Sequence, residues 1–179
     1  PGYDLHTPGT LSRTGVLDIG LRCAHSCKFC YYSFMAEKNG QHGALRNAEF
    51  RSTKDCLRII ELMAAQGLTN FDITGGEPTL HKGLEEMIRK ARQLDITSRV
   101  ITLGQHLLSA HGPHLLDRLL EAGLTDILFS LHAATEDAFR SATGASLQRI
   151  VDVMDVLDSQ GFEYTVNTVI HRGNLTDLT

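Results

Sequence analysis

The chain has 179 residues, of which 42% are hydrophobic and 21% charged, a composition typical of a globular domain and not of a disordered chain. The net charge of −4 argues against broad cationic binding to nucleic acid or to an anionic membrane. No apolar run approaches the roughly 20 residues that span a bilayer, and residues 1–12 lack a signal-peptide pattern, so we expect a cytoplasmic protein.

Short β-branched runs alternate with helical patterns along the chain. The predicted strands cover residues 16–20, 70–74, 99–103, 126–131 and 163–170. The predicted helices cover residues 53–66, 83–94, 113–122 and, in pieces, 135–160. Gly67, Gly123 and Gly161 follow predicted helices, where glycine tolerates the left-handed conformation of a helix end. This alternation implies right-handed βαβ crossovers and a parallel sheet.

The number of predicted strands indicates an α/β fold of the (β/α) barrel type, with a parallel sheet of about five to six strands. A closed eight-fold barrel normally needs about 250 residues, so we expect a partial TIM-like barrel that is open or truncated. We divide the chain into a lead-in, residues 1–15, and a core domain, residues 16–179, that is truncated at its C-terminal end. The longest connection, residues 32–51, is either a mobile loop over the site or a peripheral insertion.

Three of the four cysteines lie within eight positions, directly after the first predicted strand. They read Cys23-Ala-His-Ser-Cys27-Lys-Phe-Cys30, and such bunched thiols indicate a metal centre or redox site, not a disulfide framework. Three thiolates on a four-iron cluster would leave one iron open to another ligand. A closed zinc site needs four ligands, and His25 is the available fourth. The residues alone therefore leave iron–sulfur and zinc open.

The CxxxCxxC loop, with Phe29 before its last cysteine, resembles the signature of the radical S-adenosylmethionine (radical SAM) superfamily. The second predicted strand ends in Thr74-Gly75-Gly76-Glu77-Pro78, which resembles the GGEP motif of that superfamily. The resemblance covers residues 16 to about 174. It implies an enzyme whose [4Fe-4S] cluster, held by Cys23, Cys27 and Cys30, reductively cleaves SAM. The resulting 5′-deoxyadenosyl radical would abstract hydrogen from a substrate that the sequence does not identify.

The resemblance also implies cofactor contacts at the other strand ends and an electron donor such as flavodoxin or ferredoxin. It implies that Gly75, Gly76, Glu77 and Pro78 hold the methionyl ammonium. It also implies that Phe29 borders the adenine and that Ser130 and Asn167 contact the ribose or the carboxylate. Taken without the family, the glycines would form a tight turn, Phe29 would be core and Ser130 a solvated hydroxyl. Thr102 and His132 are further candidates for the same pocket, and no catalytic residue is assigned.

Several other polar residues are interpreted as structural. We expect Arg140 to form a surface salt bridge in preference to gripping an anion, and Cys56 to belong to the core. His106, His111 and His114 are expected to be solvated. Two alternative functions stay open: a zinc-binding α/β module without redox catalysis, and a non-catalytic radical SAM-like protein. A membrane or nucleic-acid partner is not expected.

Overall fold

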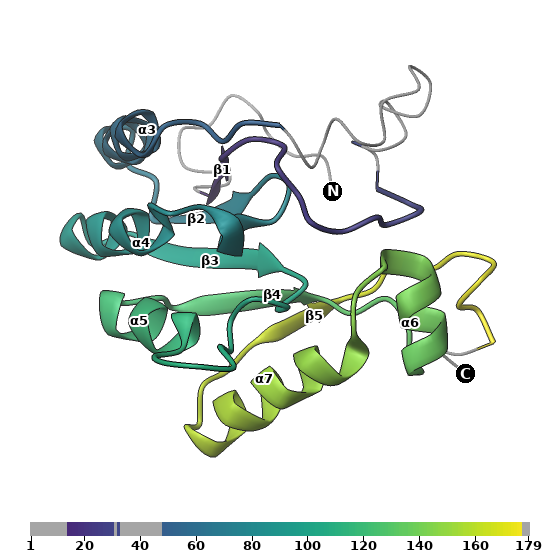
Figure 1. Cartoon of the computed structure of the whole chain (residues 1–179). Helices are drawn as coiled ribbons and strands as arrows, with labels where there is room; N and C mark the ends of the chain where they lie inside the picture. The colour runs from purple at the N-terminus through teal and green to yellow at the C-terminus, as the bar shows by residue number, and fades with distance from the viewer. Residues whose placement is uncertain (1–13, 31, 33–47, 177–179) are drawn as a thin grey trace, which may run out of the picture.

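A computed structural model describes residues 14–30, 32 and 48–176, and its centre is a five-stranded parallel sheet in the order β1-β2-β3-β4-β5 (Figure 1). The strands are β1 (Thr14–Asp18), β2 (Asn70–Thr74), β3 (Thr97–Thr102), β4 (Asp126–Ser130) and β5 (Thr165–Asn167). All four neighbouring pairs are parallel, so the prediction of an open parallel α/β sheet is confirmed. Most of the predicted loop at residues 32–51 lies outside the described residues.

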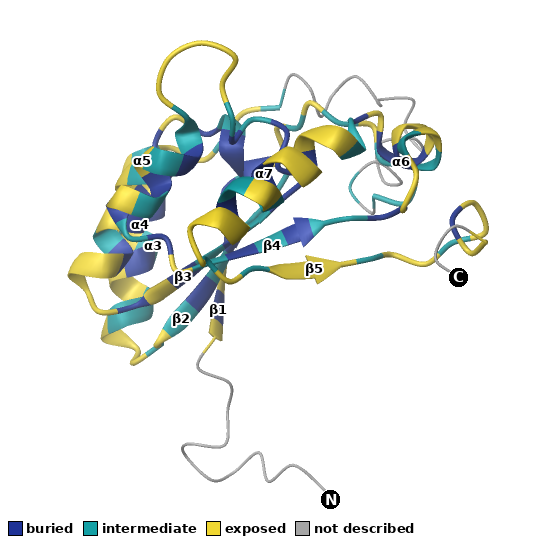
Figure 2. Cartoon of the chain, turned by 90° about the horizontal axis from the view of Figure 1, so that it is seen from below, coloured by how far each residue is buried: buried dark blue, intermediate teal, exposed yellow. Residues whose placement is uncertain are grey.

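Most of the helices in the described ranges lie on one face of this sheet. The helices are α3 (Thr53–Ala65), α4 (Leu84–Gln93), α5 (Leu115–Ala122), α6 (Glu136–Thr143) and α7 (Leu147–Ser159), with a short 3-10 helix, η1 (Pro78–Leu80). Figures 1 and 2 show α3, α4, α5 and α7 packed on the same face, whereas α6 lies beyond the strand ends. None of the helices in the described ranges combines the length and apolar character that crossing a bilayer requires.

The alternation of strand residues explains this packing. Leu17, Phe71, Ile73, Ile127 and Phe129 are at most 1% exposed and join the core beneath the helices. Their neighbours along each strand point to the opposite face, because successive side chains alternate across a sheet.

The face opposite the helices carries matched charges. Arg99 on β3 lies between Asp72 on β2 and Asp126 on β4 in the strand register. Its Nε and Nη2 donate to the two carboxylate oxygens of Asp72 at 2.8 and 3.0 Å, and its Nη1 lies 3.8 Å from Asp126 Oδ2. The forked guanidinium thus pairs with two carboxylates that are only partly exposed.

Local sequence signals explain several helix boundaries. The Ser52 hydroxyl accepts the N–H of Asp55 and starts α3, and Gly123, with φ of 104°, ends α5. The last strand differs from the prediction of residues 163–170, because only Thr165–Asn167 pair with β4. β5 is an edge strand whose three residues are exposed, so burial of side chains does not stabilise a longer strand here.

Candidate functional site

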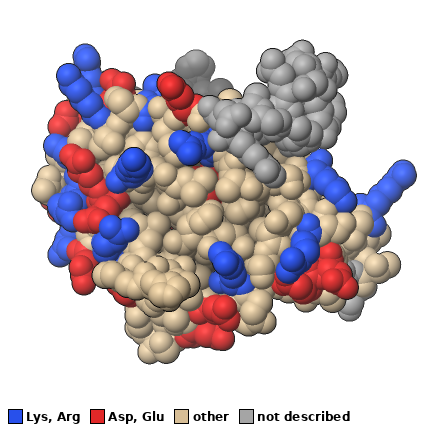
Figure 3. Space-filling model, viewed as in Figure 1, with Lys and Arg blue, Asp and Glu red and all other residues tan. Residues whose placement is uncertain are grey.

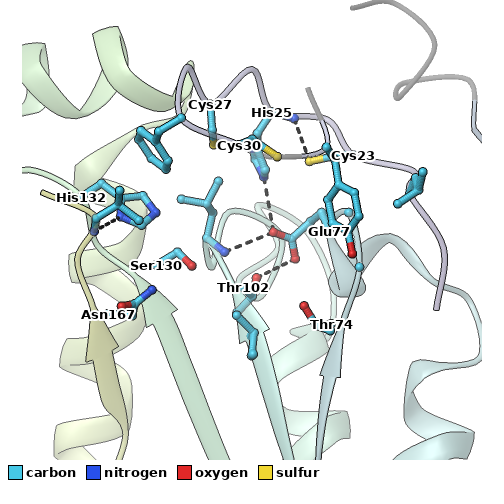
Figure 4. A pocket seen from close by; sticks show the side chains of 18 residues that line it. Cys23, His25, Cys27, Cys30, Thr74, Glu77, Thr102, Ser130, His132 and Asn167 are labelled. Carbon is cyan, nitrogen blue, oxygen red and sulfur yellow. Dashed lines mark hydrogen bonds and ion pairs between the residues drawn. The ribbon is translucent and has the colours of Figure 1, made fainter. Parts of the chain in front are cut away.

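The carboxyl ends of the strands surround a hollow of about 330 Å³, which we call the strand-end hollow (Figure 4). This volume falls within the roughly 300–1,000 Å³ typical of small-molecule sites. The structure brings nearly all the predicted site residues to its wall: Cys23, Cys27, Phe29, Cys30, Gly75, Gly76, Glu77, Ser130 and Asn167. Pro78 is not among the lining residues; it is buried in the first turn of η1, where its fixed φ suits a helix start.

The cysteine loop, residues 21–30, is anchored to the end of α6. The N–H groups of Ser26 and Lys28 donate to the carbonyls of Thr143 and Ala142 at 3.0 and 2.9 Å. The last carbonyls of a helix have no partner within the helix, so the loop satisfies groups that would otherwise need water. The Lys28 ammonium also donates to Ser141 Oγ at 3.0 Å. The backbone between Cys23 and Cys30 is therefore held by the end of α6.

The three thiols on this loop are crowded and partly buried. Burial, together with the neighbouring Cys23 and Cys30, raises the pKa of the Cys27 thiol to about 12. A positive centre between the three sulfurs would stabilise the thiolate form of Cys27 against this shift. Because thiolates bind metals in the deprotonated form, the donor set fits a cationic metal centre.

The geometry argues against a closed zinc site built with His25. The His25 imidazole is turned toward Glu77, with Nε2 3.5 Å from Oε2. Among residues 14–30, 32 and 48–176, no three His, Cys, Asp or Glu side chains are gathered around a point suited to one ion. Three thiols of one loop line one hollow, and three thiolates are a donor set that a four-iron cluster would accept.

Glu77 is the most heavily hydrogen-bonded side chain of the hollow, although it is only 2% exposed. Its Oε1 accepts the Thr79 N–H at 3.1 Å and the hydroxyls of Thr79 and Thr102 at 2.6 Å each. Its Oε2 accepts the Leu103 N–H at 3.1 Å and faces His25. One carboxylate thus connects the cysteine loop, its own turn and the end of β3.

These contacts keep the Glu77 carboxyl ionised. Burial by itself would raise its pKa, but the hydrogen bond and charge of His25 and the hydroxyls of Thr102 and Thr79 outweigh burial and lower it. The buried charge is therefore stable at neutral pH.

The two glycines of the GGEP turn, residues 75–78, fit against the segment that follows β1. A Cβ on Gly75 would lie 2.4 Å from Gly20 O, and a Cβ on Gly76 would lie 2.1 Å from Arg22 O. The N–H groups of Gly76 and Glu77 donate to those same carbonyls at 2.8 and 2.9 Å. The glycine requirement thus follows from this backbone contact, and a close approach to a ligand stays a prediction.

Phe29 and His132 form the opposite wall. The two rings meet edge to face with centroids 4.5 Å apart, and Phe29 also stacks on His171 at 5.4 Å. His132 is 4% exposed. Phe29 therefore lines the hollow, and its ring is not inserted into the core beneath the helices.

The remaining sequence interpretations have mixed outcomes. Arg140 pairs with Glu136 on the surface of α6, and Cys56 is fully buried in the core, both as predicted. His111 is exposed as expected and His114 is partly buried. The prediction for His106 is wrong: its ring stacks on His25 at 5.9 Å, and its Nε2 is buried without a hydrogen-bond partner among the described residues. This contact joins distant segments, so no local pattern could have indicated it.

Comparisons with known proteins agree with this architecture. The family model described as "Radical SAM superfamily" matches residues 17–177. The GTP 3',8-cyclase of Staphylococcus haemolyticus is 31% identical over 163 residues, covering 88% of this chain and 47% of that protein. The probable GTP 3',8-cyclase of Saccharolobus solfataricus is 29% identical over 160 residues, covering 88% and 49%. The chain thus spans about half the length of these curated relatives.

Solved structures share the fold at low sequence identity. Streptococcus suis SuiB superposes with a TM-score of 0.73 at 18% identity, covering 93% of this chain and 35% of SuiB. SuiB bound to S-adenosylmethionine gives a TM-score of 0.70 at 16% identity, with the same coverage. At these identities the likeness concerns the fold alone.

Proposed function

The chain belongs to the radical SAM superfamily of enzymes, and from that premise we propose that the strand-end hollow binds the two cofactors of the family, a [4Fe-4S] cluster and SAM. The observation that carries this proposal is the convergence of Cys23, Cys27 and Cys30 with the ends of β2, β3, β4 and β5 on one hollow. Residues 16–179 would form the radical SAM core, preceded by a lead-in at residues 1–15.

The three thiolates would hold the cluster, on a loop that the α6 carbonyls fix in place. When bound, the two cofactors supply one-electron reductive cleavage of SAM and hydrogen abstraction from the substrate. The GGEP turn would seat the methionyl end, with Pro78 setting the turn behind it. Phe29 would border the adenine, and Ser130 and Asn167 would offer hydrogen bonds to the ribose or carboxylate.

The apolar part of the wall would protect this chemistry. Leu21, Ile101 and Leu103 line the hollow beside the polar groups. Such side chains exclude water from a reactive centre, while the cofactors carry out the difficult chemistry. The intact ligand set favours a catalytic domain over a non-catalytic relative or a zinc-binding module.

The curated relatives bear the name GTP 3',8-cyclase, and they favour a nucleotide substrate for the whole protein. No Lys or Arg occurs among the described lining residues. Cations that would pair with a triphosphate would therefore come from residues other than these described ones.

The proposed setting is the cytoplasm, with a reductant such as flavodoxin or ferredoxin as partner. Basic and acidic side chains are mixed on the face shown in Figure 3, where a nucleic-acid surface would instead gather positive charge. We propose the electron donor as the macromolecular partner of this domain.

Anaerobic reconstitution with ferrous iron and sulfide tests the proposal. We expect one cluster per chain, an EPR signal after dithionite, and release of 5′-deoxyadenosine from SAM. The variants Cys23→Ala, Cys27→Ala and Cys30→Ala should each lose 5′-deoxyadenosine formation. Cys56→Ala removes a thiol buried in the core and should keep it. Zinc without sulfide, or a colourless and EPR-silent wild-type chain, would refute the proposal.

A further inference from the structure

His25 connects a thiol of the cysteine loop to the buried carboxylate of Glu77. The backbone N–H of His25 donates to Cys23 Sγ at 3.4 Å, and its ring nitrogen Nε2 lies 3.5 Å from Glu77 Oε2 (Figure 4). The side chains of His25 and Glu77 are only 6% and 2% exposed. One residue thus contacts both a sulfur that is proposed to bind the cluster and a buried anion beside it.

The His25 ring is held in this orientation by a second ring. His106 packs on it with centroids 5.9 Å apart and the two planes inclined by 27°. Nε2 of His25 is buried and faces Glu77 Oε2. An ionised carboxylate can only accept hydrogen bonds, so the nitrogen that faces it carries a proton. The ring therefore presents the positive end of an N–H group to Glu77.

The charge of Glu77 acts on the thiols of the same loop. Burial is the main cause that raises the pKa of the Cys27 thiol, and the Glu77 charge adds to that of the two neighbouring thiols in raising it further. A buried anion is poorly screened, so it also disfavours an electron added to a centre that these thiolates hold. A donor that offsets part of the Glu77 charge makes such an electron easier to add.

We propose that His25 is a positioning residue that acts through Glu77 and raises the reduction potential of the iron–sulfur cluster. This inference rests on the proposed function. The ring N–H of His25 offsets part of the Glu77 charge, and the backbone N–H does the same for the Cys23 sulfur. Both effects favour the reduced form, because hydrogen bonds and net charge around the sulfurs set the potential of a cluster. His25 thereby makes the cluster easier to reduce by the electron donor.

Two substitutions at His25 separate this role from mechanical support of the loop. His25→Gln keeps an N–H donor that reaches Glu77, whereas the shorter His25→Asn leaves the carboxylate without it. Both variants keep the backbone N–H to Cys23 and both lose the ring stack on His106, so the pair differs chiefly in the donor. Glu77 keeps four other hydrogen bonds in His25→Asn and should stay ionised at pH 8.

The measurement is a potentiometric titration of the reconstituted full chain at pH 8 without SAM, followed by EPR. We expect His25→Asn to lower the ratio of reduced to oxidised cluster at a fixed potential about threefold, and His25→Gln to stay close to wild type. Glu77→Gln, which removes the charge itself, should raise that ratio about tenfold, or about 59 mV for a one-electron couple. His111→Asn is the control at an exposed histidine and should leave the potential unchanged.

The double variant His25→Asn/Glu77→Gln tests whether His25 acts through the carboxylate. The effect of His25→Asn should disappear in it, because the anion on which His25 acts is absent. An effect that persists there, or equal potentials of wild type and His25→Asn, overturns this inference alone. Failure of His25→Asn to take up iron and sulfide overturns it as well, since His25 would then support the loop itself. If the wild-type chain takes up no cluster, the proposed function fails and the inference with it.

Discussion

The Thr102 hydroxyl donates a 2.6 Å hydrogen bond to Glu77 Oε1, which joins the end of β3 to the turn after β2 across 25 positions of the chain. The same carboxylate accepts the Leu103 N–H and faces His25 of the cysteine loop. Three loops that would otherwise move independently therefore share one buried anion.

Replacing Glu77 by Gln should destabilise the fold. The amide nitrogen of Gln is a donor and would replace one of the two carboxylate oxygens. That nitrogen would then face the Leu103 N–H or the threonine hydroxyls, which are donors too. We expect the free energy of unfolding to fall by about 1–3 kcal/mol, measured by urea denaturation. Glu85→Gln is the control, since Glu85 pairs with Arg89 on the surface and should change stability by less than about 0.5 kcal/mol. Equal effects of the two variants would contradict the buried network.

The Glu77 network also predicts a pH dependence. The pKa of Glu77 is below its ordinary value of 4.5 in the folded chain, so the unfolded chain takes up the proton at the higher pH. The stability from this group is present above about pH 4.5 and is lost as the pH falls through the lower, folded pKa. The difference in unfolding free energy between wild type and Glu77→Gln should therefore shrink on acidification from pH 7. A constant difference down to pH 3 would show that the charge is not responsible.

Gly76→Ala should disturb the site more than the fold. Its Cβ would lie 2.1 Å from Arg22 O, so the GGEP turn and the cysteine loop must separate. We expect at least a tenfold loss of SAM affinity in equilibrium dialysis, because both loops line the hollow. Gly67→Ala is the control: nothing lies within 4 Å of the Cβ added at Gly67, which itself has a positive φ of 76°. It should cost about 1 kcal/mol of stability and leave SAM binding unchanged.

Cys27 should react slowly in chain stripped of metal by a chelator. Its pKa of about 12, against an ordinary 9.0, reduces the thiolate fraction at pH 8. Allowing for the higher nucleophilicity of a more basic thiolate, iodoacetamide should alkylate Cys27 roughly thirtyfold more slowly than an unperturbed thiol. Mass spectrometry of the tryptic peptides measures the rate, which should still be rising at about pH 11, where an unperturbed thiol is almost fully ionised. A plateau reached by about pH 11 would exclude the perturbed pKa.

The sequence was sufficient for the sheet and for the order of its strands, although β1 and β3 begin two residues earlier than predicted, at Thr14 and Thr97. β2 has the predicted bounds because Asn70 and Thr74 flank an alternating pattern with Phe71 and Ile73 inward. The strand predicted at β5 is too long. A β-branched run indicates strand propensity, but it does not indicate where pairing with the neighbouring strand β4 stops.

Contacts between distant segments were beyond sequence reasoning. The His25–Glu77 pair and the His106 stack join loops whose proximity only the folded sheet creates. The hydrogen bond from Asn174 to the His132 carbonyl joins residues 42 positions apart, and no sequence motif indicates it. Polar networks of this kind depend on angles and distances that residue spacing does not encode.

The position of Asn174 imposes an order on maturation. A growing chain emerges with its N-terminus first, so the thiols are available long before the wall that holds His132 exists. The cysteine loop can be fixed once α6 has formed, whereas the wall around His132 is completed only when Asn174 has bonded to the carbonyls of His132 and Val169. A nascent chain shorter than this point would carry the three thiols without the finished wall of the hollow.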